Sequence, residues 1–330
     1  MNAFRFCAFF AFALPSLSIA CGTSGSPASV ASPDDAASPS DASSPIEASS
    51  PTDAGPPVVD AESDATAAII AARPYTLNVP PSYDASKPTP LVVMFHGYGA
   101  SGMLEEIYMG ITPTSNSAGF LYAYGDGTID DAGSRFWNAT DGCCNFNGST
   151  VDDVAYFNAI VDDVSHQYNV DPKRIFVVGH SNGGFMAHRL ACDVAPRVAG
   201  IISLAGAVWE DASKCKPANT VSVLDVHGTT DETISYDGGM SQTGQYPSEQ
   251  QTIATWTQKN GCTGSLASTG QTLDIDTVLA GSETVVSSVA GCPTGIDVQL
   301  WSIQGGKHVP SMTPSWGTLV WGFFSAHPKP

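Results

Sequence analysis

The sequence predicts an α/β domain over residues 73–330, with a mostly parallel central sheet covered by helices on both faces. Two observations carry this prediction. Short continuous apolar runs of strand length alternate with segments whose apolar residues recur at helical spacing. Several of these runs also end at a glycine, as strands buried on both faces do where the chain leaves the sheet. Reactive groups in such sheets collect at the carboxyl ends of the strands, so functional residues are expected there.

The expected elements follow in chain order. Apolar runs at 91–95 and 120–124 predict strands. Residues 152–168 predict a helix, because apolar side chains recur every three or four positions after acidic residues in the first turn. The later elements are strands at 174–178, 198–204, 221–226 and 298–303, and helices at 182–192, 248–259 and 315–326. Strand and helix alternate, which implies crossover connections over both faces of one sheet.

Residues 1–72 differ in composition from the rest of the chain. Residues 1–20 combine one early basic residue with an apolar stretch and small residues, which predicts a secretory signal peptide. A small residue before Cys21 also suits lipoprotein processing, in which this cysteine is lipidated; ordinary cleavage after Ala20 leaves the same N-terminus without lipid. Residues 21–72 are rich in Ser, Ala, Pro and Asp, so we expect a disordered tether. The protein is then secreted or displayed on the cell envelope, and it meets a membrane only through a lipid on Cys21.

Net charge indicates which partners the protein can bind, and cysteine content indicates the redox compartment in which it folds. A formal net charge of −19 argues against nucleic acid as a partner. The cysteines after residue 72 are even in number, as disulfides in an oxidising compartment require. Spacing does not fix their connectivity; we expect pairs Cys192–Cys215, Cys262–Cys292 and Cys143–Cys144. No second cysteine pair or histidine lies near Cys143 and Cys144, so no metal site or cofactor is expected.

The elbow, residues 179–183 with the sequence GHSNG, lies between an expected strand and an expected helix. It fits the G-x-S-x-G pattern, in which a tight turn presents a serine hydroxyl at a helix N-terminus and glycines let strand and helix approach. A glycine turn capped by a serine would need no partners elsewhere in the chain. A nucleophilic Ser181 needs an acid and then a histidine, in that order along the sequence.

The expected base is His308, in the base loop at residues 304–309, because this glycine-rich loop directly follows the last expected strand. The other histidines after the elbow lie in a helix, at a strand end and in the terminal tail, at His188, His227 and His327. We expect His227 to shape the loop that carries the acid.

The expected acid is Asp231, in the loop that follows the strand at 221–226, with Glu232 and Asp237 as alternatives. The expected oxyanion donors are two backbone N–H groups. One belongs to Asn182, whose side chain need not matter, and one to Tyr98 in the oxyanion loop, residues 96–99 with the sequence HGYG.

Aromatic and acidic residues elsewhere have simpler explanations. Tryptophans are more often core than ligand platform. Trp137 and Trp209 fall in loops expected near the site and are therefore candidates for the substrate pocket. Asp152 and Asp153 stand at a helix start, where capping and the helix dipole account for them.

Taken together, these motifs resemble the secreted esterase family that groups polyhydroxybutyrate depolymerase-like proteins with feruloyl and acetyl-xylan esterases. The matching stretches are HGYG at 96–99, FWNA at 136–139 with the following cysteine pair, VDDV at 151–154, GHSNGG at 179–184, HGTTD at 227–231 and GGKH at 305–308. Lys307 and Val309 depart from the family pattern.

The resemblance implies an α/β-hydrolase fold and a serine carboxylic-ester hydrolase with Ser181, Asp231 and His308 as its triad. It implies substrates among plant cell-wall feruloyl or acetyl esters, and hence a part in polysaccharide degradation, or among polyhydroxyalkanoates. The alternative is a non-catalytic surface binding protein that keeps the fold. Such a protein would not need to retain the serine, the acid, the histidine and both oxyanion loops.

Overall fold

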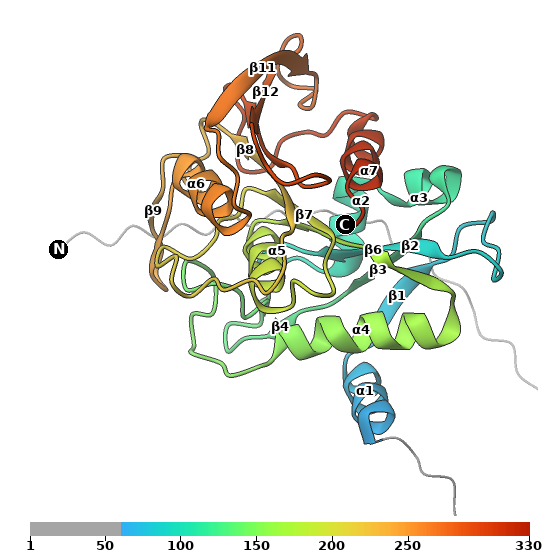
Figure 1. Cartoon of the computed structure of the whole chain (residues 1–330). Helices are drawn as coiled ribbons and strands as arrows, with labels where there is room; N and C mark the ends of the chain where they lie inside the picture. Colours follow the sequence, from blue (N-terminus) through green and yellow to red (C-terminus); the bar gives the residue numbers. More distant parts are fainter. Residues whose placement is uncertain (1–60) are drawn as a thin grey trace, which may run out of the picture. The chain divides into compact units, whose positions relative to one another are not determined.

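The computed structural model describes residues 61–330 (Figure 1). The predicted signal peptide, Cys21 and most of the predicted tether lie outside the described residues. A nine-stranded sheet forms the centre of the described part. Its strands in spatial order are β1 (Tyr75–Asn78), β3 (Leu121–Gly125), β2 (Thr89–Phe95), β6 (Val170–His180), β7 (Gly200–Leu204), β8 (Ser222–Gly228), β13 (Val298–Ile303), β12 (Thr284–Val289) and β11 (Leu266–Leu273).

The central strands, which are β3, β2, β6, β7, β8 and β13 in spatial order, run parallel to one another. The outer strands β1, β12 and β11 pair antiparallel. The predicted mostly parallel sheet is therefore confirmed. Because their ends share one sheet edge, the loops that follow β2, β6, β8 and β13 gather there.

Helices cover both faces of the sheet, as the alternating pattern predicted (Figure 1). Side chains of β2 show the division: Leu91 and Phe95 enter one core cluster, and Val92 enters the other. On the first face lie α4 (Asp153–Gln167), α5 (Asn182–Asp193) and α6 (Glu249–Lys259); on the second lie α2 (Gly102–Met109), α3 (Thr112–Ala118) and α7 (Trp316–Ala326). Within residues 61–330, no helix combines the length and the apolar character that a bilayer crossing requires.

The elements missed by the sequence analysis lack a strong apolar period. β11, with the sequence LASTGQTL, is largely exposed because it closes one edge of the sheet. The helices α2 and α3 are short, and two hairpins have two-residue strands. These hairpins are β4 (Thr128–Ile129) with β5 (Arg135–Phe136), and β9 (Gly239–Met240) with β10 (Gln245–Tyr246).

The predicted boundary between tether and domain at residue 72 is wrong. Residues Ala61–Ala72 form helix α1, which packs on α4 (Figure 1). Ile69 and Ile70 lie against the core, and an alanine-rich segment has a high intrinsic helix propensity. Arg73, next to the helix, donates to the buried carboxylate of Asp153 at 2.7 Å. Asp153 therefore also anchors α1, beyond the capping role predicted for it.

Three disulfides occur in the described part of the chain, in the expected pairing. Cys192 at the end of α5 bonds to Cys215, and Cys262 after α6 bonds to Cys292 after β12. Both link segments more than twenty residues apart, so they restrict the unfolded chain. The third joins the neighbours Cys143 and Cys144.

Candidate active site

The elbow holds Ser181 in a strained backbone conformation between β6 and α5, with φ 53° and ψ −119°. Glycine is required on both sides for steric reasons. A Cβ on Gly179 would lie 2.1 Å from the carbonyl oxygen of Gly183, and one on Gly183 would lie 2.0 Å from that of Phe95. The close approach of strand and helix therefore depends on these two positions, as the motif predicted.

The structure brings Ser181, His308 and Asp231 together in one hydrogen-bonded chain. Nε2 of His308 lies 2.9 Å from Oγ of Ser181, and Nδ1 lies 2.7 Å from Oδ2 of Asp231. The other carboxylate oxygen of Asp231 accepts the N–H groups of Thr233 and Ile234. Since a carboxylate only accepts, Nδ1 carries the proton and Nε2 is free to accept the serine hydroxyl. This arrangement can pass a proton between serine and histidine.

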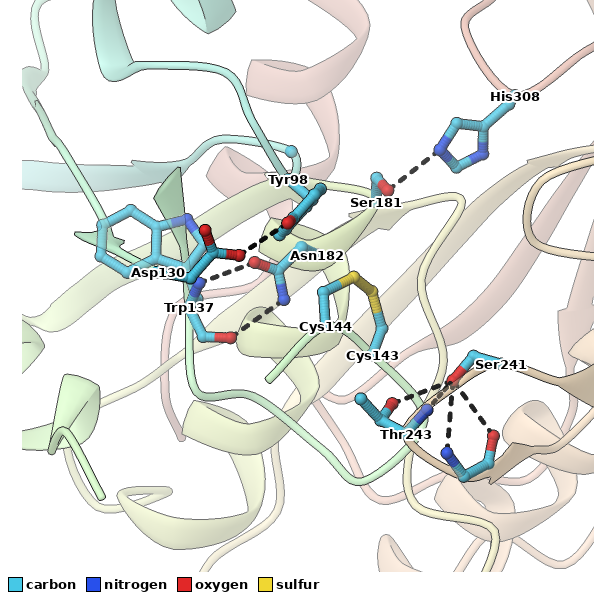
Figure 2. Close-up of a disulfide and its surroundings, with 12 residues drawn as sticks. Tyr98, Asp130, Trp137, Cys143, Cys144, Ser181, Asn182, Ser241, Thr243 and His308 are labelled. Atoms are coloured by element: carbon cyan, nitrogen blue, oxygen red, sulfur yellow. Dashed lines mark hydrogen bonds between the residues drawn. A yellow bond between two sulfur atoms is a disulfide. The ribbon is translucent and has the colours of Figure 1, made fainter. Parts of the chain in front are cut away.

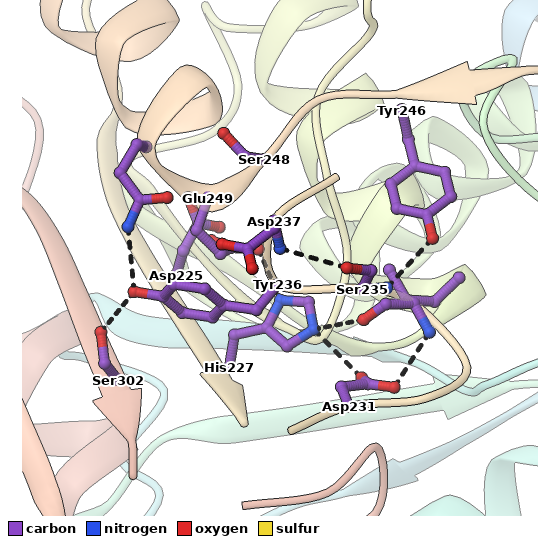
Figure 3. A network of polar contacts seen from close by, with 12 residues as sticks. Asp225, His227, Asp231, Ser235, Tyr236, Asp237, Tyr246, Ser248, Glu249 and Ser302 are labelled. Atoms are coloured by element: carbon purple, nitrogen blue, oxygen red, sulfur yellow. Dashed lines mark hydrogen bonds and ion pairs between the residues drawn. The ribbon is translucent and has the colours of Figure 1, made fainter. Parts of the chain in front are cut away.

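The alternative acids do not take part in this chain. Glu232 is 85% exposed and lies 3.6 Å from the ammonium of Lys307. The backbone N–H of Asp237 donates to Oγ of Ser235 (Figure 3), whereas the carboxylate that bonds His308 is that of Asp231.

Burial and neighbouring charges set the protonation of the histidine and the acid. Burial lowers the pKa of His308, and the positive charges of His180 and His227 lower it further against the opposing effect of Asp231. Burial alone would raise the pKa of Asp231, but hydrogen bonds from His227 and His308 outweigh it and hold this pKa well below its usual range. At neutral pH the pair is therefore a neutral imidazole beside a carboxylate.

The oxyanion loop lies directly against the elbow. A Cβ on Gly97 would be 3.5 Å from Cβ of Ser181. The next residue, Tyr98, has a backbone N–H with no acceptor among residues 61–330, and the N–H of Asn182 lies in the first turn of α5, where helices leave donors unpaired. Both predicted donors are thus adjacent to the serine and available.

The side chain of Asn182 does matter, contrary to the sequence-based expectation. Its Oδ1 accepts the backbone N–H of Trp137 at 2.7 Å, and its Nδ2 donates to the carbonyl of Trp137 at 3.0 Å (Figure 2). This two-way bond fixes the loop after β5 to the helix of the elbow. The sequence did not indicate this contact, because an asparagine that follows a serine has no pattern that points to a partner as distant as Trp137.

A second histidine, His227, also contacts the carboxylate of Asp231 (Figure 3). Nε2 of His227 lies 3.0 Å from Oδ2 of Asp231 and 2.9 Å from the carbonyl oxygen of Ile234, and Nδ1 lies 2.5 Å from Oε1 of Glu249. Burial would lower the pKa of His227, but Glu249 and Asp231 overcome that effect and raise the pKa to about 10. His227 therefore shapes the acid loop as predicted, whereas Glu249, at the start of α6, was missed.

A pocket of about 610 Å³ opens beside Ser181 and His308. Its apolar wall includes Tyr98, whose ring meets that of Phe146 edge to face at 5.1 Å. The other lining residues are Cys143, Cys144, Thr233, Ile234, Met240, Ser241 and Gln242, several of which appear in Figure 2. Most lie in short loops and in the β9–β10 hairpin, where the sequence has no apolar period to reveal them. Within residues 61–330, no group of three or more His, Cys, Asp or Glu side chains is arranged to hold a metal ion.

Neither tryptophan predicted for the pocket lines it. Trp137 is fully buried, donates its indole N–H to the carbonyl of His96 at 2.9 Å, and packs edge to face on Phe95. Trp209 is 8% exposed and belongs to the core cluster on the first face of the sheet. The interpretation of these residues as pocket candidates was wrong because both loops turn inward.

The chain is similar to several known esterases. The family described as phospholipase/carboxylesterase matches residues 148–258. Feruloyl esterase B from Piromyces equi is 26% identical over 76% of this chain and 44% of its own length. Feruloyl esterase D from Neurospora crassa is 29% identical over 77% of this chain and 82% of its own length. The chain spans about half the length of the first two curated relatives that it matches.

Among solved structures, the acetyl xylan esterase from Aspergillus awamori superposes with a TM-score of 0.56 at 14% identity, over 76% of this chain and 93% of that one. At this identity the likeness concerns the fold. The chain therefore has the α/β-hydrolase fold, and the curated relatives that it resembles are esterases.

Proposed function

We propose that this protein is a serine carboxylic-ester hydrolase. The hydrogen-bonded chain from Ser181 through His308 to Asp231 is the observation that carries the proposal. Oγ of Ser181 attacks the ester carbonyl carbon while Nε2 of His308 takes the hydroxyl proton. The oxyanion is stabilised by the backbone N–H groups of Tyr98 and Asn182.

Collapse of the tetrahedral intermediate breaks the bond to the alcohol, which leaves with the proton from His308. The acyl group then stays on Ser181. Water attacks the acyl-enzyme with His308 again as the base, and release of the carboxylic acid restores the serine. Asp231 orients His308 and stabilises its imidazolium.

Hydrolysis of a short-chain aryl ester by the wild type and by Ser181→Ala tests this proposal. We expect loss of nearly all activity in the variant, and stoichiometric labelling of the wild type, but not the variant, by a fluorophosphonate. Equal hydrolysis by both proteins contradicts the proposal. A folded wild type that neither hydrolyses nor labels would favour the non-catalytic binding protein.

For the substrate we propose soluble phenolic or acetyl esters of the plant cell wall, ahead of polyhydroxyalkanoates. The pocket supports an aromatic acyl group, because Tyr98, Phe146 and Met240 offer apolar surface and Ser241 and Gln242 offer hydrogen-bonding groups. The feruloyl esterases among the relatives point the same way. Release of ferulate from methyl ferulate, measured against release of hydroxybutyrate from its oligomers, separates the two classes; faster release from the oligomers would reverse the assignment.

We also propose export, with an esterase domain that begins near residue 61 and a lipid on Cys21. The three cysteine pairs support an oxidising compartment. Metabolic labelling with a radioactive fatty acid, compared between the wild type and Cys21→Ser, tests the lipid. Equal labelling of both proteins, or none of the wild type, rules it out.

A further inference from the structure

Glu105 is a buried carboxylate for which the proposed reaction has no role. It lies on α2, its side chain is 3% exposed, and its nearest positive partner is a histidine. Burying a carboxylate costs several kcal/mol unless hydrogen bonds and an opposite charge offset that cost. The contacts that Glu105 makes therefore indicate why it is retained there.

Those contacts reach two of the loops around Ser181. Oε2 of Glu105 accepts the backbone N–H of Gly97 at 2.9 Å, and Gly97 directly precedes the proposed oxyanion donor Tyr98. Oε1 lies 3.3 Å from Nδ1 of His180, the residue before Ser181, at ion-pair distance, and it makes no hydrogen bond in the part of the chain that the structure describes. One carboxylate thus spans the oxyanion loop and the elbow.

His180 extends this link to the base loop. Its Nε2 lies 3.0 Å from the backbone carbonyl oxygen of His308, and its ring centroid is 5.2 Å from that of His308. Nε2 bonds a carbonyl oxygen and Nδ1 lies at ion-pair distance from a carboxylate, an arrangement that favours a proton on each nitrogen and therefore an imidazolium. Burial alone would lower the pKa of His180, but Glu105 and the carbonyl of His308 outweigh it and raise the pKa.

We propose that Glu105 and His180 are positioning residues, which hold the oxyanion loop and the base loop in register with Ser181. This inference rests on the proposed function. The reaction needs the oxyanion donors, the serine and the histidine in fixed relation, and a shift of about 1 Å in such groups costs about 100-fold in rate. Glu105 ties the first loop to the elbow, and His180 ties the elbow to the last loop.

The pair has an electrostatic consequence for the base as well. Three charged groups face His308: Asp231, which favours its protonation, and His180 and His227, which oppose it. Among residues 61–330, the groups in contact with His180 are Glu105, Tyr108 and His308, and Glu105 is the negative one; Asp231 also favours protonation of His180, with a smaller effect. Without that charge the buried His180 becomes neutral, and the pKa of His308 rises.

The test compares Glu105→Gln with Glu106→Gln in the full chain. Gln at 105 keeps an oxygen for the Gly97 N–H but loses the charge. Glu106 is a matched control on the same helix, because its carboxylate accepts the backbone N–H groups of Ile111 and Thr112, away from the site.

For Glu105→Gln we expect kcat on an aryl ester to fall about 10- to 100-fold with KM changed by less than about twofold. The affinity for a trifluoromethyl ketone should fall with kcat, and the acid limb of the pH profile should move to higher pH. Glu106→Gln should change none of these. A Glu105→Gln enzyme with wild-type kcat and acid limb overturns the inference, as does an equal loss in both variants.

A second measurement does not depend on activity or on the folding of Glu105→Gln. Nitrogen-15 NMR of the wild-type histidine rings at pH 7, with the His180 signal assigned from a His180→Gln spectrum, should show two protonated nitrogens. A neutral His180 overturns the inference. A wild type that hydrolyses no ester while its His180 is doubly protonated would contradict the proposed function and leave the pairing itself intact.

Discussion

Glu249→Gln removes the negative charge that faces Nδ1 of His227 behind Asp231. Glu249 is 2% exposed, and burial together with the nearby Asp225 raises its pKa, whereas His227 and His188 lower it. The pKa of His227 is raised from 6.5 to about 10. A folded-state pKa above the unfolded value stabilises the protein fully below pH 6.5, and this stabilisation is lost as the pH rises through about 10.

The size of the effect follows from proton counting. Between about pH 7 and pH 9 the folded wild type holds one proton on His227 that the unfolded chain has released, so its free energy of unfolding falls by about 1.4 kcal/mol per pH unit from this group. In Glu249→Gln the main attraction that holds this proton is gone. The stability difference between wild type and variant should then shrink by about 3 kcal/mol from pH 7 to pH 9.

Urea unfolding of both proteins at pH 7, 8 and 9 measures this difference. His180 also has a raised pKa, but it is present in both proteins and cancels. The control is Glu210→Gln, an exposed glutamate, which should leave the difference near zero at every pH. A Glu249→Gln difference that stays constant or grows with pH refutes the assignment of an imidazolium to His227.

Three further predictions concern the site. Gly183→Ala should destabilise the protein by about 3 kcal/mol and abolish hydrolysis, because the added Cβ would collide with the carbonyl oxygen of Phe95. Gly322→Ala should be tolerated, because the space beside Gly322 is open. Thermal unfolding of the two variants measures the difference in stability. The acid limb of kcat/KM should have its midpoint below pH 6.5, since burial and two imidazolium rings lower the pKa of His308; a midpoint above pH 7 would contradict the site electrostatics. Phe146→Ala should raise KM for a feruloyl ester about 10-fold and leave an acetyl ester unchanged, since the ring lines the pocket; equal effects on both esters would argue against an acyl-binding role.

The sheet was predictable where burial leaves a local signal. The strand at 91–95 is a continuous apolar run because helices cover both of its faces. The edge strand β11 is largely exposed and polar, so its sequence does not distinguish it from a loop. Helix α1 was interpreted as part of the tether because its composition continues that of the tether, and only its packing on α4 shows that it belongs to the domain.

The sequence by itself determined the chemistry expected of this protein: a serine on a glycine-bounded turn, an acid and a histidine after it in the required order, and a loop with a free backbone donor. Such groups are local, because each follows a strand whose apolar run marks where it ends. Only the tertiary structure decided which groups surround them. The two buried histidine–glutamate pairs, His180 with Glu105 and His227 with Glu249, join residues far apart in the chain, and so do the walls of the pocket. Contacts of that kind arise from the packing of separate loops at one sheet edge, and no period in the sequence records them.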